Sequence, residues 1–332
     1  MSQTPRVSLI MTVLNEGAAL QPLLDSLSAQ TRLPDELVVV DGGSRDDTVA
    51  RLERYRQEAS FTVHLISQPG ANISQGRNRA IAAASGDVIA VTDAGVRLEP
   101  DWLEALVAPF ASDERPDVVS GFFLSDPQTT FERALGAVTL PRVEEIDPRT
   151  FHPSSRSVAF SRSAWESVGG YPEWLDYCED LLFDFGLRDA GCRFAFAPQA
   201  VAHFRPRTSY RAYCRQYYRY ARGDGKADFW RWRHALRYAT YAALVVSLVM
   251  ALGGRPLWWL AVAAMIGLTI ARAMQRLWAS RQEIPRQERL RTMLWGPIIA
   301  WTGDVAKMLG YPVGVVWRWR HAPAKPWPKR QW

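Results

Sequence analysis

Carboxylate and glycine residues end several short apolar runs in the first hundred residues, and residues of this kind can bind a nucleotide or a metal ion. Asp41 ends the second run, where its carboxylate could accept hydrogen bonds from a base or a ribose while Gly43 lets a ligand approach the backbone. The alternative is an ordinary turn in which Asp47 caps a helix. Asp93 ends the fourth run, where a carboxylate could hold a divalent cation that neutralises diphosphate oxygens.

An acidic pair and a single arginine could add proton transfer and anion binding. Glu179 and Asp180 open an acidic, helix-like segment, and either carboxylate could be the general base that takes a proton from an attacking hydroxyl. Their alternative role is a favourable interaction with the helix dipole, worth about 0.3–1 kcal/mol. Arg77 offers one fixed cation to an anionic ligand, and His203 is as often an ordinary surface residue as a ligand.

A basic and aromatic segment follows His203. Residues 204–237 contain ten Lys and Arg residues against two acidic ones. Gln216, Arg219 and Tyr220 lie in an amphipathic, helix-like part of this segment and could form an aromatic and cationic floor for an acceptor and a leaving diphosphate. The alternative is a membrane-surface helix whose long side chains extend toward water.

A sheet of parallel strands would bring the first group of residues together. Across residues 7–124, apolar runs rich in β-branched residues alternate with helical patterns, which predicts βαβ units and an α/β domain with a mostly parallel central sheet. Ligands bind such sheets at the carboxyl ends of the strands, where Asn15, Glu16, Asp41 and Asp93 stand. No GxGxxG motif follows the first strand, so a dinucleotide site is not expected.

The last third of the chain has a different composition. Residues 238–271 contain one charged residue, Arg255, in a turn-like GGRP sequence, and two apolar segments of about 16 residues flank that turn. Both outer flanks are rich in arginine. The positive-inside rule therefore predicts a helical hairpin in the cell (inner) membrane, with the N-terminal domain in the cytoplasm. The alternative is a pair of buried core helices.

Two further segments of the sequence, near its C-terminal end, indicate contact with a membrane. A third apolar stretch, residues 293–317, is interrupted by Pro297 and Pro312 and could span, re-enter or lie on the surface. The basic, tryptophan-rich tail, residues 318–332, favours an interfacial anchor on anionic headgroups. The net charge of +6 fits either nucleic acid or anionic lipid, and the position of the basic segment beside the hairpin favours lipid and argues against nucleic acid.

Length and composition bound the organisation of the chain. Its 332 residues correspond to about two domains, and 48% hydrophobic with 22% charged residues exclude wholesale disorder. The three cysteines form no CxxC pair and favour a reducing compartment, and no signal peptide is visible. The predicted parts are a catalytic domain at 1–204, a basic amphipathic helix at 205–236, the membrane hairpin at 237–272, and a linker, third apolar segment and cytoplasmic tail at 273–332.

Six sequence motifs occur in a characteristic order. They are MTVLNE, VVVDGGSRDDT, GANISQGRNRAI, VTDAGVRLEPDWL, CEDLLFDFGLRDAG and QYYRYARG, and they cover residues 7–225, about two thirds of the chain. In this order and spacing they resemble the family-2 inverting glycosyltransferases, whose nucleotide-sugar-binding fold is called GT-A. The resemblance implies an enzyme that moves a sugar from a nucleotide-sugar donor, with UDP-sugars favoured, to a lipid-linked or polysaccharide acceptor.

The resemblance also implies roles for individual residues. The positions expected to bind the nucleotide sugar are Asn15, Glu16, Asp41, Gly43, Arg77 and Asp93. Asp180 matches the acid that acts as catalytic base, with Glu179 beside it, and Asp93 and His203 match positions that contact Mg²⁺ or Mn²⁺. The residues that resemble the Gln-x-x-Arg-Trp motif near the acceptor and the departing diphosphate are Gln216, Arg219 and Tyr220.

Two positions depart from the family pattern. Gly95 replaces the second acid of the Asp-x-Asp motif, which removes one expected metal ligand, and Tyr220 replaces a tryptophan. Two other functions remain open for this chain. One is a membrane-bound scaffold that has lost catalysis through Gly95, and the other is a nucleotidyltransferase that uses the same base and metal positions to attack phosphorus.

Overall fold

A computed structural model describes residues 5–321, which form two compact units. The first unit contains residues 5–124 and 142–204, and the second contains residues 125–141 and 205–321. The sequence analysis groups residues 125–141 with the catalytic domain. In the structure this segment packs in the second unit because Phe131 and Leu135 join an apolar cluster with Tyr213, Leu277 and Ile299.

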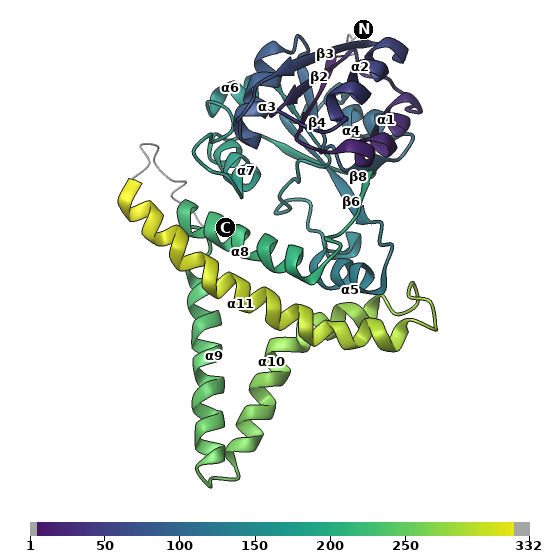
Figure 1. Cartoon of the computed structure of the whole chain (residues 1–332). Helices are drawn as coiled ribbons and strands as arrows, with labels where there is room; N and C mark the ends of the chain where they lie inside the picture. The colour runs from purple at the N-terminus through teal and green to yellow at the C-terminus, as the bar shows by residue number, and fades with distance from the viewer. Residues whose placement is uncertain (1–4, 322–332) are drawn as a thin grey trace. The chain divides into compact units, whose positions relative to one another are not determined.

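An eight-stranded sheet forms the centre of the first unit (Figure 1). The strands are β1 (Val7–Val13), β2 (Glu36–Asp41), β3 (Thr62–Ser67), β4 (Val88–Val91), β5 (Val96–Leu98), β6 (Val118–Ser125), β7 (Val158–Ser161) and β8 (Phe194–Phe204). They are arranged in the order β3-β2-β1-β4-β7-β6-β8-β5. The strands β3, β2, β1 and β4 are parallel, while β7 pairs antiparallel with β4 and β6, and β5 with β8. The α/β fold predicted from the alternating pattern is confirmed, as a mixed sheet.

Helices cover both faces of this sheet. They are η1 (Gly17–Leu20), α1 (Gln21–Ser28), α2 (Thr48–Glu58), α3 (Ile73–Ala83), α4 (Trp102–Val107), η2 (Ala108–Ala111), η3 (Val143–Glu145), α6 (Arg162–Ser167) and α7 (Glu179–Asp189). One apolar core contains Leu24 and Trp102, and the other contains Ile81 and Phe183, on α3 and α7. Strands buried on both faces explain why the runs are continuously apolar.

The strand register brings the predicted strand ends together. Val13 pairs with Asp41, and Asp41 pairs with Ser67, so the loops after β1, β2 and β3 leave the same edge of the sheet. Helix α3 packs close to this edge because Gly76 has no side chain. A Cβ at Gly76 would lie 2.7 Å from Cγ2 of Thr12 on β1.

The second unit is helical. Its helices are α5 (Thr130–Thr139), α8 (Tyr210–Ala227), α9 (Arg231–Leu252), α10 (Trp258–Ala279) and α11 (Arg289–His321). Helices α9 and α10 form a hairpin that extends away from α8 and α11 (Figure 1). Each has 22 residues, more than the 16 or so of the apolar segments, because the arginine-rich flanks continue the helices.

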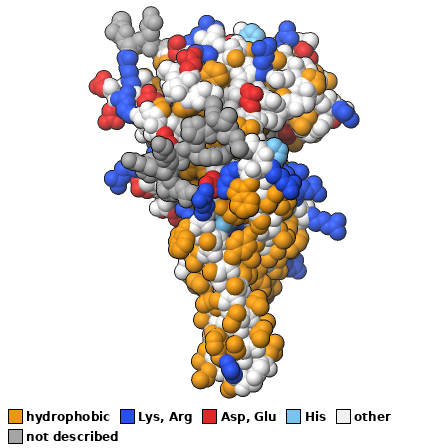
Figure 2. Space-filling model, turned by 90° about the vertical axis from the view of Figure 1, so that its left-hand side faces the viewer, with side chains coloured by type: hydrophobic (Ala, Val, Ile, Leu, Met, Phe, Trp, Pro, Cys, Tyr) orange, Lys and Arg blue, Asp and Glu red, His pale blue; other side chains and the backbone are white. Residues whose placement is uncertain are grey.

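The hairpin helices are exposed rather than buried. Among residues 5–321, α9 and α10 are the two helices long and apolar enough to cross a membrane, and only 11% and 17% of their apolar windows are buried. Apolar side chains cover the surface of the hairpin, with Lys and Arg side chains gathered above it (Figure 2). The alternative of a buried core pair is therefore wrong, since core helices are covered by protein.

Helix α11 is continuous over 33 residues. Pro297 and Pro312 lie inside it, so the interruptions expected from these prolines do not divide the stretch. Glycines let α11 and α8 pack closely, because a Cβ at Gly310 would overlap the carbonyl oxygen of Tyr218, and one at Gly314 that of Arg222. The predicted anchoring tail is part of α11 up to His321, and its remainder, residues 322–332, lies outside the described residues.

Candidate active site

The loops after β1 and β2 are tied together by polar contacts. The Asp41 carboxylate accepts hydrogen bonds from the backbone N–H groups of Gly43 and Ser44, each at 3.1 Å. Asn15, with φ 55°, accepts a 2.9 Å hydrogen bond at Oδ1 from the N–H of Arg45, while the N–H of Asn15 donates to Ser44 Oγ. The structure thus brings Asn15, Asp41 and Gly43 together, and Asp41 shapes the turn that presents them.

Backbone conformation explains two residue types in these loops. Gly43 has φ +100°, a left-handed conformation that favours glycine, and a Cβ there would lie 3.2 Å from Pro69. The backbone N–H of Glu16 donates to Thr48 Oγ1 at 2.9 Å, which fixes the end of β1 against the start of α2. These contacts connect the strand-end loops to α2 and to the loop after β3.

Arg77 connects three elements of the first unit. Its guanidinium donates to Glu179 Oε1 at 2.8 Å and to Asp93 Oδ1 at 3.1 Å, and it lies 5.3 Å from the ring centroid of Tyr171. The residue is only 3% exposed. Arg77 is expected near the nucleotide phosphates, and in the structure its guanidinium pairs with two carboxylates of the protein. Helix α3, the loop after β4 and the start of α7 thereby meet at one point.

Burial changes the protonation of this cluster. Burial and the adjacent Asp180 raise the pKa of Glu179 to about 7, although Arg77 opposes the shift. Burial alone would lower the pKa of Arg77, but Glu179, Tyr171 and Asp93 hold it above its ordinary value. The arginine is therefore always charged, while Glu179 exchanges its proton near neutral pH.

Asp184 is a buried acid one helical turn after Asp180, and the sequence analysis does not identify it. Burial, and secondarily Asp180, raise the pKa of Asp184 well above its ordinary value. Its Oδ2 atom has no hydrogen-bond partner within residues 5–321. Burial therefore favours the protonated form of Asp184. The apolar periodicity of the segment gives no sign of this, because an acid at a core position is an exception to the pattern.

Asp180 is the more accessible acid of the predicted pair. It lies at the start of α7 and is half-buried, whereas Glu179 is buried. Its Oδ1 accepts a 2.8 Å hydrogen bond from the N–H of Leu181. Cys178, the residue before the helix, has φ 65°, and this left-handed turn sets the direction in which the helix starts. Of the two acids, Asp180 is the one with exposed surface.

Asp93 lies between two arginines. One is Arg77, which pairs with Asp93 Oδ1. The other is Arg156, whose Nε atom is 3.9 Å from Asp93 Oδ2 and whose guanidinium lies 4.2 Å from the ring centroid of Phe204. The Asp93 side chain is 34% exposed, so it can meet a ligand. The sequence analysis misses Arg156, because it stands in an irregular segment with no periodic pattern.

The predicted acceptor motif lies on α8. Gln216 Nε2 donates to Tyr220 Oη at 2.7 Å, which places these residues on one side of the helix with Arg219 between them in sequence. Tyr217 packs against Tyr220 with ring centroids 5.9 Å apart. Tyr220, which replaces the family tryptophan, therefore accepts a hydrogen bond from Gln216. A tryptophan could not accept this bond, because an indole N–H is only a donor.

Comparison with known proteins places this site in a family. The sequence profile of glycosyl transferase family 2 matches residues 8–163. The profile of glycosyl transferase family group 2 matches residues 88–280, and this second match covers more than half of the chain. This chain belongs to glycosyltransferase family 2. The resemblance seen in the six motifs is confirmed, and the protein is a glycosyltransferase.

Relatives and solved structures agree with this membership. The O-antigen chain rhamnosyltransferase RfbN of Salmonella typhimurium is 27% identical over 63% of this chain and 70% of its own length. The mannosyltransferase PcManGT from Pyrobaculum calidifontis, solved with GDP-Man and Mn²⁺, is 19% identical and has a TM-score of 0.58 over 95% of this chain and 88% of its own. GalNAc-T7, solved with UDP, GalNAc and Mn²⁺, has a TM-score of 0.52 at 17% identity over 70% of this chain and 49% of its own. These likenesses establish the GT-A fold of this glycosyltransferase.

Few side chains of this glycosyltransferase are placed to bind a metal ion at the predicted site. His203, one of the two predicted ligands, has Nε2 2.5 Å from Glu99 Oε1, and it stands opposite Arg97 where β8 pairs with β5. Residues 5–321 contain no group of three or more His, Cys, Asp or Glu residues that could hold a metal ion. A Cβ at Gly95 would meet no atom within 4 Å, so space remains where the second acid of the motif is missing. The donor set does not fit a metal ion held by the protein alone.

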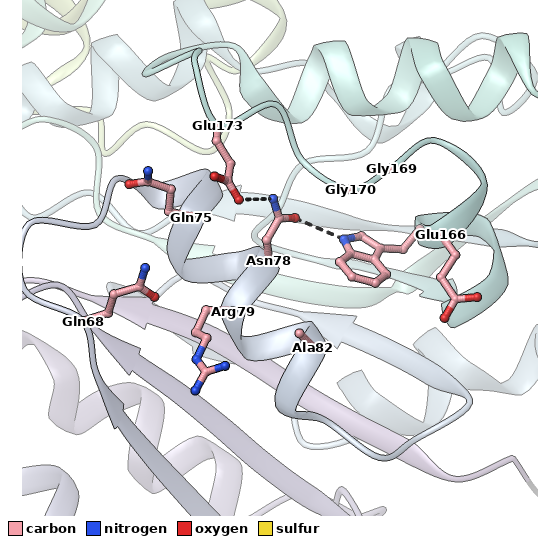
Figure 3. A pocket seen from close by; sticks show the side chains of 10 residues that line it. Gln68, Gln75, Asn78, Arg79, Ala82, Glu166, Gly169, Gly170 and Glu173 are labelled. Atoms are coloured by element: carbon pink, nitrogen blue, oxygen red, sulfur yellow. Dashed lines mark hydrogen bonds between the residues drawn. The ribbon is translucent and has the colours of Figure 1, made fainter.

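A separate pocket of about 590 Å³ lies beside the outer face of α3. Asn78, which lines it, accepts a hydrogen bond from Trp165 Nε1 and donates one to Glu173 Oε1, at 3.1 and 2.9 Å (Figure 3). None of the predicted site residues lines this pocket. Arg77 and Asn78 are adjacent on α3 and both contact Tyr171, Arg77 at its ring and Asn78 at its backbone.

Proposed function

We propose that this glycosyltransferase transfers a sugar, with inversion at the anomeric carbon, to a lipid-linked or polysaccharide acceptor at the cytoplasmic face of the cell membrane. The observation that carries the proposal is the connection of the Glu179–Asp180 pair to Asp93 through Arg77. It links the acid that would accept a proton to the strand end that would hold the donor. RfbN supports the choice of acceptor, because its name describes synthesis of an O-antigen chain.

Asp180 acts as the general base in this proposal. It takes the proton of the acceptor hydroxyl as that oxygen attacks the anomeric carbon, and the bond to the diphosphate oxygen breaks with its electron pair on the leaving group. The proton remains on Asp180, and a nucleoside diphosphate departs. Arg77 is a positioning residue, because it holds Glu179 and Asp93 without offering its charge to the substrate.

The donor binds at the loops after β1, β2 and β4 in this proposal. Asp41 and Gly43 receive the base and ribose, with Asn15 beside them, and the donor classes to compare are UDP-, GDP- and dTDP-sugars, with UDP favoured. Arg156 supplies a cation near the diphosphate, next to Asp93. Arg219 and Gln216 on α8 serve the acceptor and the departing diphosphate.

The steps of this mechanism use residues of the chain, and a divalent cation would add charge neutralisation at the diphosphate. Mg²⁺ or Mn²⁺, expected from the resemblance, would take most of its ligands from the donor diphosphate, with Asp93 as the carboxylate of the protein. His203 has a different partner in Glu99. Charge on the leaving group is instead offset by arginines, which is the kind of electrostatic stabilisation that usually contributes most to catalysis.

Membrane association is the remaining part of the proposal. Helices α9 and α10 would cross the bilayer as a hairpin, and their arginine-rich outer ends would keep both flanks, and the first unit, in the cytoplasm. Anionic lipids would attract these flanks. A lipid-linked acceptor then has its hydroxyl at the same surface as the enzyme.

Asp180→Asn tests the catalytic assignment, and Asp184→Asn is its matched control. The same substitution one turn along α7 is a mild change in the control, because burial favours the neutral form of Asp184 and asparagine is also neutral. We expect Asp180→Asn to lower donor turnover about 10²–10⁴-fold with donor binding retained, and Asp184→Asn to keep turnover within a few-fold. Turnover by Asp180→Asn at the rate of the control would refute the assignment. Absence of donor binding by the unaltered protein would favour the scaffold.

A further inference from the structure

Helix α11 exposes a single apolar stripe. Between Arg291 and Arg320, every side chain that the structure leaves exposed is apolar. The stripe is defined here by Leu294, Ile298, Trp301, Val305, Leu309 and Val316, which are between 38% and 63% exposed. Most of these residues are three or four positions apart, which puts them on one face of the helix over about 33 Å.

The polar side chains of α11 lie away from this stripe and inside the second unit. Asp304 accepts a 2.7 Å hydrogen bond from Arg237 Nε on α9, and Lys307 Nζ lies 4.9 Å from the ring centroid of Tyr217 on α8. Gly303, Gly310 and Gly314 pack against α8. A helix at a water surface turns its charges outward and its apolar face inward, so α11 has the opposite arrangement.

The pattern of exposure distinguishes α11 from a helix that crosses a membrane. In α9, the exposed residues Ala242, Val245, Val246, Leu248 and Val249 point in several directions around the helix, as expected where lipid surrounds a span. In α11 the exposed side chains occupy one face, and α8 covers the other. Helix α11 is also outside the pair of described helices apolar enough to cross a membrane.

We propose that α11 lies in the plane of the membrane interface, with its stripe in the lipid of the same leaflet that the α9–α10 hairpin enters and with α8 on its other side. Continuity with the hairpin identifies lipid as the occupant, because residues 280–288 alone separate α10 from α11. Arginines at both ends of α11, Arg289 and Arg291 at one end and Arg320 at the other, match anionic headgroups. Basic side chains gather where the apolar surface of the hairpin ends (Figure 2).

This arrangement would fix the height of α8 above the bilayer. Packed helices have axes about 8–10 Å apart, and the glycines of α11 bring α8 to the close end of that range. Gln216 and Arg219 would then stand one helix layer above the lipid, at the level of headgroup phosphates. The inference rests on the proposed membrane association and is independent of the sugar-transfer chemistry.

Spin-label depth measurements test the inference on the full chain. The native cysteines, Cys178, Cys192 and Cys214, are replaced by serine, and one cysteine is introduced at a time in protein reconstituted into phosphatidylcholine–phosphatidylglycerol vesicles. The stripe positions are Ile298, Val305, Leu309 and Val316. The controls are Val246 in the middle of α9 and Val49, an exposed residue of α2. Collision of each label with oxygen and with a water-soluble nickel chelate gives its depth.

We expect all four stripe labels to favour oxygen at a similar shallow depth of about 5–10 Å, with Val246 deeper and Val49 in water. Depths that rise and fall along α11 would show a spanning helix, and nickel access at the stripe would show a water-exposed one. Broadening between labels at the stripe would show a second copy there. Each of these three results would overturn the inference, and failure of oxygen to reach Val246 would instead refute membrane association.

Discussion

Arg77 is the residue on which the geometry of the catalytic unit depends. It is buried, and it forms ion pairs with carboxylates from the loop after β4 and from α7. Removing one partner of a buried ion pair is costly because the other charges remain without compensation. These ion pairs support the proposed positioning role of Arg77, which its place in a sequence motif does not reveal.

Arg77→Met should destabilise the protein by about 3–5 kcal/mol, because Asp93 would lose its counterion and the buried Glu179 would lose its hydrogen-bond donor. Arg79→Met is the matched control, since Arg79 is exposed on the same helix. Its effect should stay within about 0.5 kcal/mol. Denaturant unfolding of the detergent-solubilised protein measures both values, and equal destabilisation by the two variants would contradict the positioning role.

Buried acids predict a direction for the pH dependence of stability. The pKa of Glu179 rises from 4.5 to about 7 on folding, and that of Asp184 also rises. At pH values between the ordinary and the raised pKa of such an acid, the folded state binds more protons than the unfolded state. The free energy of unfolding therefore falls as pH increases through this range. Asp184→Asn removes one titrating group. Its free energy of unfolding should fall less than that of the unaltered protein as pH increases above the ordinary carboxyl range; equal falls would contradict a raised pKa of Asp184 in the fold.

At the scale of elements, the contact between α8 and α11 supports the acceptor motif. Gly310→Ala would place a Cβ on the carbonyl oxygen of Tyr218, and because that oxygen belongs to backbone, the helices would have to separate. We expect a loss of about 1–3 kcal/mol, seen as a lower melting temperature in detergent. Gly267→Ala on α10 is the control, because a Cβ there meets no atom within 4 Å. An unchanged melting temperature for Gly310→Ala would contradict close packing of α11 against α8 at Gly310.

The sequence predicts local elements better than it predicts their partners. Alternation of apolar runs and helical patterns correctly indicates the parallel strands and the hairpin, because each element carries its own periodicity. The pairing of β5 with β8 and the packing of residues 125–141 in the second unit depend on contacts distant in sequence. Likewise Asp41 and Asp93 could be identified as strand-end acids, whereas Arg156 and Asp184 could not, since only the folded chain brings them to the site.

At the scale of the whole molecule, the proposed topology places the two ends of the hairpin on opposite sides of the membrane. The loop between α9 and α10 contains one charged residue, Arg255, whereas arginines flank the hairpin at its other end. In cells expressing the cysteine-free chain, Arg255→Cys should react with an impermeant maleimide added outside. Val49→Cys on α2 should react only after the membrane is opened. The reverse pattern would contradict a cytoplasmic catalytic unit.

Transfer with inversion is the part of the proposed function that a product of the reaction can test. The most direct measurement incubates the full chain with a panel of UDP-, GDP- and dTDP-α-sugars and a lipid-linked acceptor fraction, and determines the anomeric configuration of the product by NMR spectroscopy. We expect one donor class to give a β-linked product, with no product from Asp180→Asn. An α-linked product from the same donor would contradict single displacement by a hydroxyl that Asp180 deprotonates.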